Sequence, residues 1–346
     1  MRPLTLWSVL RKCLLLSVVF LIVAVAALKF GAVPVSIYGL LRDLLHVALG
    51  RTSELSSEYR MIIFDIRLPR ILLGAFVGAA LSVAGTSFQA LLRNPLADPY
   101  VLGVSSGAAV GAILALIVEP YLNLPVLAAA LLTPLGAFLG ALLTIAGVYL
   151  LARREGQVDG STLLLSGIIS ASFLSAVIMF LMRTLSGRDL RGIAFWLMGD
   201  LSTPLPRGFQ WILAVVFFAA VAAIYTTAAD LNLLLAGEQE AMHLGVDIKR
   251  VRLVVYVAAS ILTGIAVSVS GSIGYVGLLV PHLMRLLFGS DHRVLLPTAA
   301  IGGAIAVVLA DTLARTVVAP TDLPVGAMTA LAGAPLFIHL LRRRAA

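Results

Sequence analysis

About ten long apolar runs, separated by short polar or Pro/Gly-marked breaks, constrain this 346-residue chain more than any other feature. A membrane-spanning helix needs about 20 apolar residues. Lipid cannot satisfy exposed backbone groups, so continuous runs of this kind predict helices that cross a bilayer. Only 12% of the residues are charged, whereas a soluble domain carries about 25%. We therefore expect an all-α integral membrane protein with one transmembrane domain over residues 1–346.

The breaks between the runs give the predicted boundaries of the spans. The second run begins soon after two arginines, and the eighth and ninth runs are short and interrupted by proline and glycine. The first run could instead be a cleaved signal peptide, but the many runs that follow it favour a retained helix. The predicted spans are 14–30, 71–92, 101–118, 126–151, 163–182, 210–228, 253–270, 275–288, 295–310 and 325–341.

The positive charges indicate how the spans are oriented. Cytoplasmic loops of membrane proteins are rich in Lys and Arg close to the helix ends. Arg153-Arg154 and the run Arg342–Arg344 fall on the same side as the N-terminus if the span count is even. This predicts N- and C-termini in the cytoplasm. The net charge of +8 is then explained by the cationic loops that orient the helices, and we expect no nucleic-acid partner.

Two sequence patterns predict how the helices pack. Ser82–Gly85 resembles Ser268–Gly271, which suggests inverted repeats formed by spans 2–5 and 7–10, although chance similarity in such a composition is a rival explanation. Glycines four residues apart let helix backbones approach closely. Three such pairs predict a tightly packed bundle: Gly74 and Gly78, Gly107 and Gly111, and Gly136 and Gly140.

The chain carries no recognisable energy source. An ATPase needs the loop G-x-x-x-x-G-K-[ST], but none of the lysines (Lys12, Lys29 and Lys249) follows a glycine. The acidic residues fall in loops or near the ends of the predicted spans, whereas proton-coupled carriers place ionisable groups inside the membrane. Two alternatives remain open: an ion-coupled secondary transporter working as a single chain, and a membrane-embedded enzyme with a clustered polar site.

Three strings identify a known family. They read Arg-Asn-Pro-Leu-Ala from Arg93, Gly-Leu-Leu-Val-Pro-His ending at His282, and Asp-Leu-Pro-Val-Gly from Asp322. From about residue 66 to 341 the chain resembles the FecCD-type permeases, the membrane subunits of ABC importers for iron-siderophores, haem and vitamin B12. The resemblance implies a type II ABC importer permease that moves a ferric siderophore, haem or cobalamin by alternating access.

The same resemblance implies partners and a location. We expect two ABC ATPase subunits, a periplasmic or lipid-anchored substrate-binding protein and a second permease copy, with a homodimer favoured. The chain itself would not be an enzyme and would hold no cofactor or metal, because ATP and Mg would sit on the ATPase. The multi-pass protein would lie among the lipids of the bacterial cytoplasmic (inner) membrane.

The longest polar gap, residues 229–252, is expected to face the ATPase. Its centre predicts a short helix closed by Gly245. It resembles the family's coupling segment, Leu-Gly-Glu-x-x-Ala-x-x-Leu-Gly, which docks into a cleft on the ATPase, although a solvated loop helix is the alternative. The residues implied in coupling are Gly237, Glu238, Glu240, Ala241, Leu244 and Gly245.

Two further sets of residues follow from the resemblance. At the outer end, Arg67, Arg70 and Arg315 would receive acidic residues of the binding protein, a role that suits the bidentate guanidinium, with lipid-headgroup anchoring as the alternative. At the cytoplasmic end, a gate is implied at Asn94, Leu96, Gly160 and Ser161. Relatives often have Ser or Thr at the Gly160 position, so this chain departs from the pattern there.

Overall fold

The structure is a computed structural model. It describes residues 5–31, 33, 39, 42, 45–46, 49–50, 61–154, 157–158, 160–185, 187–203 and 205–345. Within these ranges eight helices are long and apolar enough to cross a membrane, and two shorter apolar helices accompany them. The prediction of an all-helical protein with about ten spans is therefore confirmed.

The long helices occupy the positions that the apolar runs predict. They are α1 (Leu6–Lys29), the π-helix η1 (Met61–Arg67) continuing into α4 (Leu68–Leu91), α5 (Val104–Val118), α6 (Val126–Ala152), α7 (Gly160–Met182), α9 (Arg207–Thr226), α12 (Ile248–Ser270) and α14 (His292–Ala314). The two shorter apolar helices are α13 (Val276–Phe288) and α15 (Val325–Ala345).

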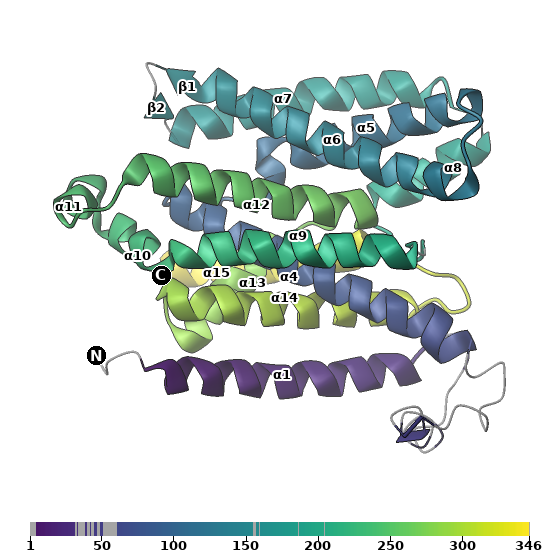
Figure 1. Cartoon of the computed structure of the whole chain (residues 1–346), viewed down its shortest axis with the longest axis horizontal. Coiled ribbons are helices and arrows are strands. Elements are labelled where there is room, and N and C mark those ends of the chain that lie inside the picture. Colours follow the sequence, from purple (N-terminus) through teal and green to yellow (C-terminus); the bar gives the residue numbers. More distant parts are fainter. Residues whose placement is uncertain are drawn as a thin grey trace.

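Shorter elements join these helices at the two ends of the bundle. One end carries η3 (Glu119–Tyr121) and α8 (Gly187–Leu197), which the apolar runs did not predict. The other end carries α10 (Ala228–Ala236), α11 (Glu238–His243) and a two-residue antiparallel pair, β1 (Arg153–Arg154) with β2 (Gln157–Val158). The short helix η2 (Pro99–Leu102) lies deeper in the bundle, against Gly167 of α7. Both chain termini lie toward the same end as α11 (Figure 1).

The ninth predicted span was too short. The sequence placed it at 295–310, as a short run marked by proline and glycine, but α14 runs from His292 to Ala314. Pro297 lies in the second turn of α14, where it removes one backbone hydrogen bond without ending the helix, and the carbonyl of Arg293 accepts from the hydroxyl of Tyr225 (3.4 Å). Gly303 sits at a helix crossing, because a Cβ there would lie 2.1 Å from the carbonyl oxygen of Gly78. The longer helix brings Asp311 inside a spanning segment.

Helices α4 and α12 form the centre of the bundle. They are the most buried of the spanning helices, whereas few residues of α1, α6 and α7 are buried. Helix α4 packs against α12 and α14, and α12 packs against α6. In the two predicted repeats, α4 and α12 are the first helices and α6 and α14 are the third. Each first helix thus contacts the third helix of the other repeat, an arrangement that supports inverted repeats.

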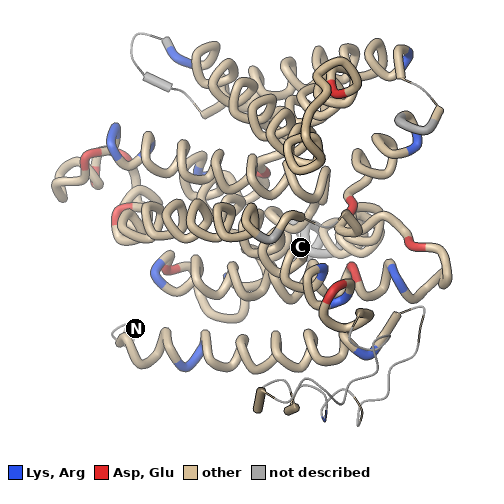
Figure 2. Tube along the Cα trace, turned by 45° about the vertical axis from the view of Figure 1, so that its right-hand side comes forward, with Lys and Arg blue, Asp and Glu red and all other residues tan. Residues whose placement is uncertain are grey.

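Close glycine contacts hold the helices together. Gly107 and Gly111 of α5 meet Gly140 and Gly136 of α6, because a Cβ on Gly111 would lie 2.0 Å from the carbonyl oxygen of Gly136. The predicted use of these two pairs at a helix interface is confirmed. Most charged residues lie toward the two ends of the bundle (Figure 2), as expected where helix ends meet water.

Candidate functional site

At the end that carries α11, two glycines shape the predicted coupling segment. Gly237 separates α10 from α11 with φ +138°, and Gly245 ends α11 with φ +85°. The N–H of Val246 donates to Ala241 and the N–H of Gly245 donates to Met242, which is the Schellman pattern of a helix C-terminus. The predicted helix closed by Gly245 is confirmed, and both glycines are needed because L-residues rarely adopt these φ values.

The segment presents one apolar face outward and packs the other inward. Leu235, Met242 and Leu244 are exposed, in positions where a partner could cover them. Ala241 is fully buried, in a cluster with Ala90 of α4 and Val251 of α12. Ala241 therefore packs against the rest of the chain, whereas the exposed leucines and methionine face outward. The coupling role of all these residues stays a prediction.

Polar contacts fix α10 and α11 to three other elements. The amide of Asn232 donates to Asp291 (2.8 Å) and accepts from the backbone N–H of His292 (2.8 Å), which ties α10 to the start of α14. The carboxylate of Glu238 accepts from Arg93 (2.9 Å), after α4, and from Arg252 (2.5 Å), on α12. Glu240 is exposed. The basic groups predicted to meet Glu238 are thus supplied by its own chain.

Asp291 is held as a carboxylate at this end. It caps the N-terminus of α14 and receives hydrogen bonds from Arg293 and Asn232. The hydrogen bond from Arg293 is the main cause that lowers the pKa of Asp291 to about 2, with Asn232 contributing. A charged Asp291 can therefore orient Asn232 throughout the neutral pH range.

The predicted gate residues lie in a loop between α4 and η2 and at the start of α7. The side-chain oxygen of Asn94 accepts from the N–H of Leu96 (2.9 Å), a local turn that exposes Leu96. A Cβ on Gly160 would lie 3.4 Å from a methyl group of Leu92. The structure therefore brings this loop and the start of α7 together, with Ser161 exposed beside them. Their role as a gate stays a prediction.

Asp98 closes the same loop. Its side chain accepts from the N–H of Tyr100 (2.8 Å) and caps η2. Burial raises the pKa of Asp98 to about 6, and the hydrogen bond from Tyr100 opposes that shift. The loop therefore contains a carboxyl whose charge changes just below neutral pH.

At the opposite end of the bundle, Arg67 caps a helix. Its guanidinium donates to the carbonyls of Leu28 (2.5 Å) and Lys29 (3.1 Å) at the end of α1, and also to Val33. The last carbonyls of a helix lack intrahelical partners and carry partial negative charge, so a cation is favourable there. Arg67 is only 4% exposed; it holds the end of α1 against the start of α4.

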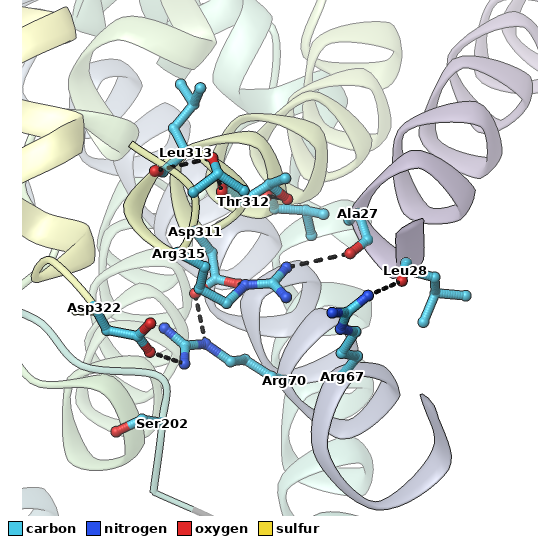
Figure 3. A network of polar contacts seen from close by, with 12 residues as sticks. Ala27, Leu28, Arg67, Arg70, Ser202, Asp311, Thr312, Leu313, Arg315 and Asp322 are labelled. Carbon is cyan, nitrogen blue, oxygen red and sulfur yellow. Dashed lines mark hydrogen bonds and ion pairs between the residues drawn. The ribbon is translucent and has the colours of Figure 1, made fainter. Parts of the chain in front are cut away.

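Arg70 and Arg315 share a buried carboxylate (Figure 3). Asp311 on α14 pairs with Arg70 (2.7 Å) and with Arg315 (3.0 Å), and Arg70 also pairs with Asp322 (2.7 Å) in the segment before α15. The Asp311 side chain is 1% exposed, whereas that of Asp322 is 44% exposed. Burying these charges is costly, and their mutual pairing offsets part of that cost.

The three predicted docking arginines therefore lie together at one end, but as buried residues with partners in the described part of the chain. Docking to a binding protein stays a prediction. The geometry adds a condition: of the three, Arg70 holds the most exposed partner, Asp322. An incoming acidic residue could exchange with Asp322 without opening the Asp311 pair.

Sequence reasoning missed the partners of these arginines and of Glu238. Asp311 was placed just outside its span, and Asp322 was read only as part of a family string. Arg93 and Arg252 were counted as positive charges of the cytoplasmic loops. A charged residue inside an apolar helix was the available signal for Asp311; no local pattern pointed to the pairing of Arg93 with Glu238.

The bundle of apolar spanning helices, with the short helix α11 beyond one end, defines a multi-span integral membrane protein. The sequence model of the FecCD transport family matches residues 18–343, and the chain belongs to this family. It is 44% identical over 315 residues to the cobalamin import system permease protein BtuC of Halobacterium salinarum, covering 90% of this chain and 82% of the relative.

Two other comparisons agree with that membership. The chain is 44% identical over 286 residues to the hemin transport system permease protein HmuU of Yersinia pestis, covering 81% of this chain and 83% of the relative. Its fold matches a chain from an inward-facing ABC transporter of the metal-chelate type, with a TM-score of 0.77 and 31% identity, over 96% of this chain and 99% of the other. The chain is thus a multi-pass ABC transporter permease.

Proposed function

We propose that this chain is the permease subunit of a binding-protein-dependent ABC importer for a metal chelate: a ferric siderophore, haem or cobalamin. The observation that carries the proposal is the α10–α11 segment, which is shaped by Gly237 and Gly245 and exposes apolar side chains beyond the ends of the spanning helices. Two relatives of equal identity, named for cobalamin and for hemin, support the chelate class.

The proposed orientation places the α11 end in the cytoplasm of a bacterial inner membrane. Both termini lie toward that end (Figure 1). Lys12, Arg93, Arg153, Arg250 and Arg252 belong to it, and an excess of Lys and Arg near helix ends marks the cytoplasmic side.

The proposed partners divide the work. Two ATPase subunits would dock under α11, carrying ATP and Mg, and would hydrolyse ATP on their own chains. A second copy of this permease would complete a central path, with α7 presenting exposed apolar residues such as Phe173 and Phe180. A substrate-binding protein would deliver the chelate at the end that carries Arg70.

The rival is a secondary transporter driven by an ion gradient. Its clearest candidate group is Asp311, which the structure places inside a spanning helix. That carboxylate pairs with both Arg70 and Arg315 near the helix end. A proton carrier must take up and release its proton in the cycle, whereas this carboxylate is held in ion pairs with two arginines. The geometry therefore favours the ABC importer.

Purification and uptake test the proposal together. The tagged chain is purified from its host together with the subunits that bind it. The complex is placed in vesicles, and the binding protein encoded in the same operon is added. We expect an ATPase to co-purify and uptake of haemin, cyanocobalamin or a ferric siderophore to require ATP. Uptake by the chain without an ATPase, driven by a proton or sodium gradient, would establish the rival.

A further inference from the structure

The carboxylate of Glu238 joins three elements at the α11 end. Glu238 is the first residue of α11, Arg93 follows the end of α4, and Arg252 lies in the second turn of α12. Both arginines contact the same carboxylate oxygen, Oε1. A carboxylate that accepts from two guanidinium groups is held more firmly than one in a single surface pair, because its own side chain is ordered once for both.

Arg93 reaches Glu238 from an unusual backbone position. Its φ is +48°, and the N–H groups of Arg93 and Asn94 donate to Ala90 and Gln89. This is the same Schellman pattern that ends α11, but there the left-handed position holds Gly245. A non-glycine residue in this region costs about 1 kcal/mol. Backbone strain of this kind often marks a functional residue, which here is Arg93 with its side chain placed against Glu238.

The position of Arg93 matters because of its neighbours. Asn94 and Leu96 follow it in the loop proposed as the cytoplasmic gate, and Leu92 before it approaches Gly160 of α7. Any displacement of Arg93 therefore moves the loop at its first residue. The contact with α11 crosses 145 positions of sequence, so it joins the coupling segment directly to the gate loop.

The exposure of the three side chains suits a contact that changes in a cycle. Glu238 and Arg252 are each 33% exposed and Arg93 is 48% exposed. In water such pairs contribute about 0–1 kcal/mol. A partner covering the exposed face of α11 would exclude water and strengthen the same contacts, since charges attract more strongly at lower dielectric. Docking and release of a partner would thus tighten and loosen the connection.

We propose that Arg93, Glu238 and Arg252 form the mechanical link that passes movement of α11 to the gate loop at residues 92–98. The proposal rests on the proposed function as an ABC importer permease. In it the three side chains are positioning residues: they contact neither ATP nor the transported solute. Arg252 fixes Glu238 to α12, and Arg93 carries the displacement of Glu238 into the loop.

Arg93→Gly is the sharpest variant, because glycine suits the left-handed backbone and only the side chain is lost. The whole transporter, with its ATPase and binding protein, is assayed in vesicles for ATP hydrolysis and for solute uptake. We expect thermal unfolding at or above the wild-type temperature, together with ATP hydrolysis that continues. The number of ATP molecules hydrolysed per solute imported should rise about fivefold or more.

Three further variants separate the ion pair from other causes. Glu238→Gln should raise the ATP-to-solute ratio as Arg93→Gly does, and Arg93→Lys should keep the ratio close to the wild type because the cation remains. Arg250→Gln, which removes an exposed arginine two positions before Arg252, should leave the ratio unchanged and controls for lost positive charge at this end.

The outcomes are distinct. A wild-type ratio in Arg93→Gly, with wild-type uptake, overturns the link while leaving the importer assignment intact. Equal uncoupling in Arg93→Lys and Arg93→Gly also overturns it, because the charge would then be irrelevant. If the wild-type complex shows no ATP-dependent uptake of any chelate, the proposed function fails first.

Discussion

The two ends of the bundle both contain a carboxylate between two arginines, but the surroundings differ. At the end distant from α11, Asp311 is 1% exposed and its arginines are 7–10% exposed. At the α11 end, Glu238 is 33% exposed and its arginines are 33–48% exposed. A buried charge left without its partner is costly, whereas water compensates an exposed one. The same kind of ion pair is therefore held permanently around Asp311, whereas the pairs of Glu238 can break and re-form.

Replacing Asp311 should have the largest effect on stability. Asp311→Ala leaves Arg70 and Arg315 buried without their shared carboxylate, a change that typically costs about 3–5 kcal/mol. Thermal unfolding of the purified transporter in detergent measures it. Asp322→Asn is the matched control: its side chain is 44% exposed, and we expect a loss below about 1 kcal/mol. Equal losses in the two variants would contradict the distinction between buried and exposed pairs.

Replacing Arg67 should have the next largest effect, and a local one. Arg67→Met keeps the apolar stem but removes the hydrogen bonds to Leu28 and Lys29. Hydrogen bonds from a charged donor contribute about 1.5–3 kcal/mol. We expect faster amide hydrogen exchange at residues 26–30, the last turn of α1, with little change in α12. Uniform acceleration across the whole bundle would show that Arg67 does more than cap α1.

Replacing Glu238 should hardly change stability. Its pairs are partly exposed, so Glu238→Gln should cost less than about 1 kcal/mol in thermal unfolding while it uncouples ATP hydrolysis from uptake. This is the reverse of Asp311→Ala, which should lower the amount of folded transporter without changing the ATP-to-solute ratio of the molecules that remain. A large loss of stability in Glu238→Gln would show that the Glu238 pairs are permanent structural contacts, like those of Asp311.

A further prediction concerns pH and Asp98. Its pKa in the folded protein is about 6, above the ordinary value of 3.8 for an aspartate. The folded state therefore binds more protons between these values, and the stabilising contribution is complete below about pH 4. It is lost as pH rises through about 6. Asp98→Asn can still cap η2, and the wild type should lose stability relative to it between pH 4 and 7. Parallel pH curves would contradict the raised pKa.

Local sequence patterns were enough for the parts of the fold that depend on local physics. The spans were predictable because burial in lipid requires a continuous apolar helix, and the end of α11 because Gly245 adopts a backbone that other residues avoid. The same reasoning failed at the ends of α14, because the short run marked by Pro297 and Gly303 belongs to a longer helix in which Gly303 lies at a helix crossing. It also missed α8, which is too short to give an apolar run.

The sequence by itself determined that this chain spans a membrane, that it lacks an ATP-binding loop and that residues 229–252 form a separate polar segment. Only the tertiary structure decided which charges meet. Arg70 and Asp311 are 241 positions apart and Arg93 and Glu238 are 145 apart, so no local periodicity relates them. Burial also emerges only from packing: the arginines expected to face a partner are enclosed by α1, α4 and α14, while Glu238 remains within reach of water.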